Sequence, residues 1–151
     1  MLWIKSNEGK DAQENQNLRE NIYRKHLQDS IITEAVFSDG TEMFLNPSEP
    51  KAGEALTIRI RTAMENVDKV VLVANGKEYT MEQARQDALF DYYQKTIKTP
   101  KEKLNYYFIL QRKEQICYYC RIGVQNKETC EKYPFFVLPG FSTPKWAKGV
   151  V

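Results

Sequence analysis

The amino-acid sequence predicts an all-β fold, an immunoglobulin-like antiparallel β-sandwich of about eight strands. Short apolar or alternating segments recur along the chain, and turn-forming residues separate them at intervals of roughly 8 to 12 positions. No helical pattern alternates with these segments, which argues against a parallel sheet. At 151 residues, the chain is long enough for one domain with a single core.

The first 30 residues differ in character from the rest. Residues 11–29 are polar, lack Gly and Pro, and carry a thin apolar stripe at helical spacing, which includes Leu18 and Leu27. This pattern predicts a short helix or a disordered leader that adds little to the core. We therefore expect a polar leader over residues 1–30 and the β-sandwich over residues 31–139.

The first half of the predicted sandwich opens with an apolar run at residues 32–37. Prolines in the connection that follows exclude a central strand there. Residues 56–62 alternate strictly between aliphatic and polar side chains, which predicts a strand with one buried face. Residues 67–74 and 77–81 predict a hairpin, because the intervening Asn-Gly pair favours a two-residue turn.

Four further strands are predicted in the second half. Residues 104–110 alternate clearly, with Leu104, Tyr106, Phe108 and Leu110 on one face, and a turn leads from them into a hairpin partner. The predicted strands are residues 90–97, 104–110, 115–120 and 133–138.

Charge and hydropathy argue against two classes of partner. With 22 Lys and Arg against 20 Asp and Glu, the net charge of +2 gives no basic surface for a phosphate backbone, so we expect no nucleic acid. No apolar run approaches the ~18 residues that cross a bilayer, and residues 1–10 lack the pattern of a signal peptide. We expect no membrane partner and a cytoplasmic protein.

Candidate catalytic residues are few. The single histidine, His26, lies in the polar leader, where a solvated imidazole is expected. The sequence contains no nucleophile elbow, phosphate loop or His-Glu-x-x-His motif, and its carboxylates do not single out a glycosidase pair. We therefore assign no catalytic residue and no cofactor, and we expect that this chain by itself is not an enzyme.

Cys117, Cys120 and Cys130 are an odd number of thiols, which does not suit a disulfide framework. The Cys-x-x-Cys spacing admits a zinc or redox reading. Residues three apart on a strand point to opposite faces, however, and zinc needs four converging ligands. We expect structural or incidental cysteines and no metal site.

Six of the nine tyrosines form adjacent pairs in predicted strands. Neighbours on a strand face opposite sides, so one ring of each pair is expected to leave the core. An exposed ring suits stacking on sugars or a protein interface, whereas buried pairs would stabilise the sheet. Our candidate carbohydrate-binding or interface residues are Tyr93, Tyr107 and Tyr119, with Tyr107 the best placed because the other face of its strand is apolar.

Several segments in order resemble a known module, the N-terminal β-sandwich of neopullulanases, cyclomaltodextrinases and related bacterial α-glycosidases, called carbohydrate-binding module family 34. These segments are residues 37–42, 56–62, 66–70, 89–93 and 104–108. Residues 139–141 and 143–151 are similar to the linker that leads those enzymes into a (β/α)8 barrel. The resemblance thus runs from residue 32 to the end of the chain.

The resemblance implies a non-catalytic N-terminal domain of an α-glucan-hydrolysing glycosidase of the α-amylase family, which contributes α-glucan binding, dimerisation or both. Its implied partners are α-glucans such as starch, maltooligosaccharides or cyclodextrins, and the catalytic barrel of the same or a partner subunit. It also implies that residues 140–151 are the linker and that Trp146 packs between domains. The family's catalytic carboxylates lie in the barrel, so none is carried over. The alternative is a free-standing immunoglobulin-like interaction domain without sugar binding.

Overall fold

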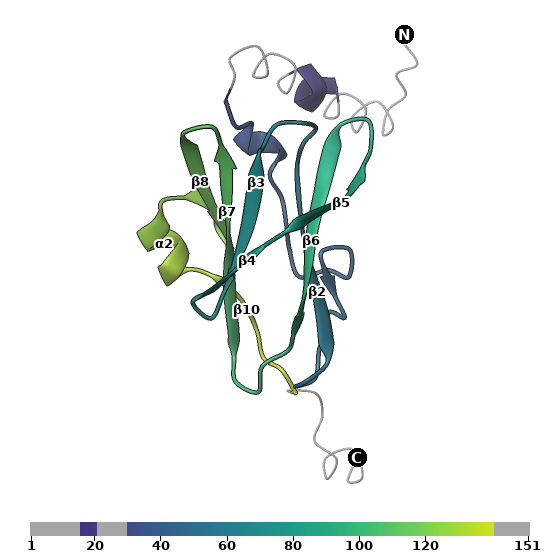
Figure 1. Cartoon of the computed structure of the whole chain (residues 1–151), viewed down its shortest axis with the longest axis vertical. Coiled ribbons are helices and arrows are strands. Elements are labelled where there is room, and N and C mark those ends of the chain that lie inside the picture. Colours follow the sequence, from purple (N-terminus) through teal and green to yellow (C-terminus); the bar gives the residue numbers. More distant parts are fainter. Residues whose placement is uncertain (1–15, 21–29, 141–151) are drawn as a thin grey trace, which may run out of the picture.

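The chain folds into two antiparallel sheets that face each other, as Figure 1 shows for the computed structural model, which describes residues 16–20 and 30–140. The first sheet has the order β1-β2-β6-β5, and the second has the order β4-β3-β7-β8-β9, with β10 also paired to β7. This arrangement confirms the predicted all-β sandwich.

The strands of the first sheet are β1 (Leu45–Asn46), β2 (Ala55–Ala63), β5 (Glu82–Gln86) and β6 (Phe90–Lys98). Those of the second sheet are β3 (Lys69–Ala74), β4 (Lys77–Thr80), β7 (Leu104–Arg112), β8 (Gln115–Cys120), β9 (Gly123–Gln125) and β10 (Phe135–Val137). Two short helices complete the described fold, the 3-10 helix η1 (Thr33–Ala35) and the α-helix α2 (Lys127–Lys132).

The core lies between the sheets and follows the alternation of the sequence. Leu56, Ile58 and Ile60 of β2 are fully buried, while the intervening side chains lie on the outer face. Across the sandwich, β7 contributes Leu104, Tyr106, Phe108 and Leu110 to the same cluster. Both predicted alternations are therefore confirmed, because burying one face of each strand fixes its register.

The Asn-Gly hairpin is also confirmed. Asn75 and Gly76 have φ values of 49° and 82°, as a two-residue turn between β3 and β4 requires. The Asn75 side chain also ties this turn to the start of β7, since its Oδ1 accepts from the Asn105 N–H at 2.8 Å.

The first apolar run is not the strand that the sequence predicts. Residues 33–35 form η1, and of this run only Phe37 pairs with β2, through an isolated bridge to Arg61. The physical reason is that a side chain replaces a neighbouring strand as hydrogen-bond partner. The Ile32 N–H donates to Asn66 Oδ1 at 2.7 Å and is therefore not available for pairing with a strand.

In the leader, residues 16–20 are helical, which agrees with the helical alternative for that part, and the rest of residues 1–29 lies outside the described residues. Leu18 packs against a small buried cluster of Ile32, Ala35 and Ala63 at one end of the sandwich. Among the described residues, no helix is long and apolar enough to cross a bilayer.

Candidate functional site

Two of the three candidate tyrosines point into the core. Tyr93 pairs with Ile60, and Tyr119 pairs with Phe108, so each shares the inward face of its partner. Each ring is 8% exposed, and the Tyr93 hydroxyl donates to the Val67 carbonyl at 3.5 Å. The expectation that these two rings leave the core is wrong. In each strand, the alternation of side chains turns this tyrosine toward the core and its neighbour, Tyr92 or Tyr118, toward the outer face.

Tyr107 does point outward, as expected, but it is covered. It lies on the outer face of the second sheet in a small cluster with Val73, Cys120 and Cys130, the last of which belongs to α2. Only 9% of Tyr107 remains exposed. The sequence could not reveal this cover, because α2 is short and polar apart from Cys130.

A hollow of about 380 Å³ opens beside Tyr107. Its polar lining comes from Asn75, Asn105 and Glu131, and Val73, Gly76 and Pro134 complete the wall. Burial, and next the Glu131 carboxylate, raise the pKa of Tyr107, so its hydroxyl stays protonated and able to donate a hydrogen bond. The hollow thus combines one phenol, two amides and one carboxylate.

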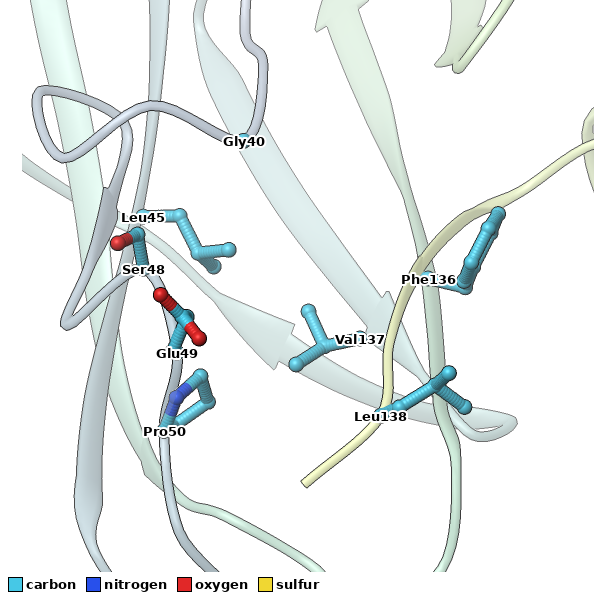
Figure 2. Close-up of a pocket in the computed structure, with 8 residues that line it drawn as sticks. All are labelled: Gly40, Leu45, Ser48, Glu49, Pro50, Phe136, Val137 and Leu138. Carbon is cyan, nitrogen blue, oxygen red and sulfur yellow. The ribbon is translucent and has the colours of Figure 1, made fainter. Parts of the chain in front are cut away.

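A second concavity, a groove of about 330 Å³, lies between the β1 region and β10. Figure 2 shows Leu45, Glu49 and Pro50 on one wall, with Val137 pointing into the groove from the other. Phe136 and Leu138 point away from it, toward solvent. The two walls are joined near Pro50, because the Gly140 N–H donates a hydrogen bond to the Pro50 carbonyl at 3.2 Å.

Three large apolar side chains are exposed within residues 133–138, and two of them, Phe136 and Leu138, belong to residues that line this groove. Tyr133, Phe136 and Leu138 are 37%, 49% and 47% exposed, and we call them the β10 surface. Two cations contact its rings: Lys103 Nζ lies 4.6 Å from the centre of the Phe136 ring, and Arg121 Cζ lies 5.7 Å from that of Tyr133. Sequence reasoning read this apolar run only as a strand and missed its exposure.

The thiols separate as the strand reading predicts. Cys117 belongs to the central core, whereas Cys120 belongs to the outer cluster under α2. No group of three or more potential metal ligands occurs within the described parts of the chain. The Cys-x-x-Cys pair therefore does not converge on one point.

Four aspartates serve turns and loops. Each accepts a hydrogen bond from a backbone N–H, and the pairs are Asp39 with Thr41, Asp68 with Lys113, Asp87 with Leu89 and Phe90, and Asp91 with Glu65. By accepting these hydrogen bonds, the carboxylates stabilise the conformations of turns and loops. His26 and Trp146 lie outside the described residues.

These features define an immunoglobulin-like sandwich with an exposed apolar surface at β10. The sequence matches the family of α-amylase N-terminal Ig-like domains over residues 32–141. The chain belongs to this family, and the resemblance seen in the sequence is confirmed.

Solved structures share the fold. A cyclomaltodextrinase superimposes with a TM-score of 0.61 at 21% identity, over 76% of this chain and 22% of its own length. A maltogenic amylase from S. marinus gives 0.56 at 18% identity, over 76% of this chain and 16% of its own. The chain thus spans about a fifth of the length of these proteins. No curated protein matches at a significant level.

Proposed function

We propose that this domain is a packing module of an enzyme that acts on α-glucans. In this proposal, the β10 surface of Tyr133, Phe136 and Leu138 contacts the catalytic barrel of the same or a partner subunit. The observation that carries the proposal is the exposure of this surface, which directly precedes the tail of the chain. Membership of the α-amylase N-terminal family supplies the class of partner.

The distribution of exposed apolar side chains supports packing. Of the six large hydrophobic side chains that are exposed in the described residues, three belong to the β10 surface. An exposed cluster of this kind marks a contact site more often than a scattered single side chain does. The flanking Lys103 and Arg121 add a polar rim, and aromatic and Arg side chains are common in the centres of interfaces.

The burial of the tyrosines argues against a stacking platform as the main role. Sugar stacking needs an open ring face, and Tyr93, Tyr107 and Tyr119 each expose less than a tenth of their surface. Stacking on these rings would require the covering side chains to move, whereas the side chains of the β10 surface are already exposed.

Two experiments test the packing role. An antibody raised against this chain should detect, in cell extract, a polypeptide longer than the 17.7 kDa sequence. In that longer polypeptide, Phe136→Ser with Leu138→Ser should weaken the contact between domains or subunits. Ile116→Ser is the matched control, because Ile116 is similarly exposed, at 51%, but lies on β8, away from β10. A product of 17.7 kDa would instead favour the free-standing interaction domain.

The hollow beside Tyr107 supports a second candidate role, contact with an α-glucan. Its phenol, amides and carboxylate are groups that hydrogen-bond sugar hydroxyls, and it is lined by the one candidate tyrosine that faces outward. An NMR titration with maltoheptaose and β-cyclodextrin tests it. Saturable shifts at Asn75, Asn105 and Glu131 that weaken in Tyr107→Phe would support the role, and unchanged spectra at millimolar sugar would reject it.

A further inference from the structure

The attachment of α2 to the sheet depends on one side chain. Among the six residues of α2 (Lys127–Lys132), Cys130 is the buried one, and it is 0% exposed. It packs onto the outer face of the second sheet against Val73, Tyr107 and Cys120. The rest of α2 is half-buried at most, so this thiol is the anchor of the helix.

The chain path brings a second thiol to the same place. Cys120 ends β8 and is also 0% exposed, with its Sγ 3.6 Å from the Gly123 carbonyl across a tight turn. The chain then runs through β9, and Asn126 caps α2 by accepting from the Thr129 N–H. The helix so placed packs on β8, and the Cys120 and Cys130 side chains are buried in the same small cluster on the outer face of the sheet. Cys117 is on the opposite face, in the central core.

We propose that Cys120 and Cys130 form a reversible disulfide that fixes α2 to β8 over Tyr107 when the protein meets a disulfide oxidant of the glutathione type. In the balanced step, one thiolate attacks a sulfur of the oxidant and releases one reduced thiol. The second thiolate then attacks the protein sulfur of the mixed disulfide and releases another. Two S–H bonds are lost, one S–S bond forms, and the oxidant takes up two electrons and two protons.

Opening of α2 controls this reaction. In the closed structure both cysteines are fully buried, and burial together with Cys120 raises the pKa of Cys130 to about 12, which disfavours the reactive thiolate. A six-residue helix with one buried side chain opens at low cost. Once open, its thiol regains an ordinary pKa of about 8.5 and can react.

Cys117 is the internal comparison. It lies in β8 among the side chains of the central core, and burial raises its pKa as well. Cys117 is 9% exposed, but its neighbours belong to the central core and not to a short helix, so bringing a second thiol to it requires the sheet to separate, which approaches global unfolding. The oxidant should therefore select the outer pair and spare Cys117.

A Cys120–Cys130 bond would also fix the hollow beside Tyr107. Two residues that line that hollow come soon after Cys130 in the chain. Glu131 is the next residue of α2, and Pro134 lies two residues beyond the end of the helix. Locking the helix therefore holds this wall in place. The disulfide stands independently of the packing role and of any sugar contact.

The test uses the full 151-residue chain, incubated with glutathione disulfide and then blocked with a thiol reagent in denaturant. We expect a loss of about 2 Da, one blocked thiol at Cys117, and a disulfide-linked peptide pair containing Cys120 and Cys130. Dithiothreitol should reverse the change. Hydrogen exchange at residues 127–132 should slow on oxidation, because the closed helix can no longer open.

Matched variants decide the assignment. Cys117→Ser should form the same bond, whereas Cys120→Ser and Cys130→Ser should yield no internal bond; Cys120→Ala and Cys130→Ala repeat the test with an apolar replacement. A bridge to Cys117 would overturn the proposal. So would three unmodified thiols, or glutathione adducts without a bridge, under conditions in which the amides of α2 exchange.

Discussion

The guanidinium carbon of Arg61 lies 4.0 Å from the centre of the Phe90 ring, on the outer face of the first sheet. A second ring, that of Phe37, lies 5.3 Å from the same atom, and the Arg61 Nε donates to the Ala35 carbonyl at 3.1 Å. The side chain that alternation assigns to the solvent thus joins η1, β2 and β6. The Phe90 ring that Arg61 contacts also packs against the cluster of Ile32, Ala35 and Ala63, which Leu18 of the leader contacts as well.

Arg61→Ala should lower the free energy of unfolding by about 1–2 kcal/mol, since it removes a partly desolvated cation–π contact and a hydrogen bond. Urea unfolding followed by circular dichroism measures the change. Arg85→Ala is the control, because Arg85 contacts a single ring, that of Tyr92, from the exposed edge strand β5. Equal losses in the two variants would show that Arg61 has no special bridging role.

Asn66 ties the start of the domain to the sandwich. It is 1% exposed, its Oδ1 accepts from the Ile32 N–H, and its Nδ2 donates to the Ser30 carbonyl at 2.9 Å. Asn66→Ala leaves both backbone groups without this partner and should cost about 2–3 kcal/mol in thermal or urea unfolding. Asn66→Asp keeps an acceptor for Ile32 but loses the donor to Ser30. An Ala variant as stable as the wild type would contradict this account.

Stability should fall at alkaline pH through Tyr106. Burial, and next the Asp39 carboxylate, raise the pKa of Tyr106 above that of an unfolded tyrosine, which is about 10. A raised pKa means that the folded state holds the proton more tightly. Its contribution is complete below about pH 10 and is lost as the pH rises further, by up to about 1.4 kcal/mol per unit.

Tyr106→Phe tests this dependence. The variant should show a smaller loss of stability than the wild type when urea midpoints are compared on either side of about pH 10. Tyr118→Phe is the control, because Tyr118 lies on the outer face and remains half-buried. Parallel pH profiles for wild type and Tyr106→Phe would show that this phenol does not contribute.

The turn between β3 and β4 offers a test of backbone conformation. Gly76 has a φ of +82°, and no atom lies within 4 Å of an added Cβ, so Gly76→Ala tests conformation without a steric clash. We expect a loss of about 1 kcal/mol in unfolding free energy. Gly40→Ala is the control, because Gly40 is equally open and has no positive φ. A neutral Gly76→Ala would contradict the strained-turn explanation.

Much of the fold was accessible from sequence, because burying one face imposes a period of two. Leu56, Ile58 and Ile60 carry that signal, and the Asn-Gly turn sets the hairpin after β3. β5 escaped prediction because all five of its side chains are exposed, which leaves no alternation to detect. η1 escaped because the Asn66 side chain, far along the sequence, competes for the Ile32 amide.

The candidate site was predicted only in part. Adjacent tyrosines do face opposite sides, but which ring points inward depends on the register with Ile60 and Phe108. The outward Tyr107 is covered by α2, a helix whose one buried anchor is Cys130. Tertiary cover of this kind leaves no local pattern in the sequence.

The most direct test of the packing role is calorimetry of the complete polypeptide encoded by the gene, compared with its Phe136→Ser and Leu138→Ser double variant. If the β10 surface packs on a catalytic barrel, the wild type should unfold in one coupled transition. The variant should then show a separate, lower transition for the sandwich, while Ile116→Ser should behave as the wild type. Identical coupled transitions in wild type and double variant, or a polypeptide that ends at Val151, would contradict the account.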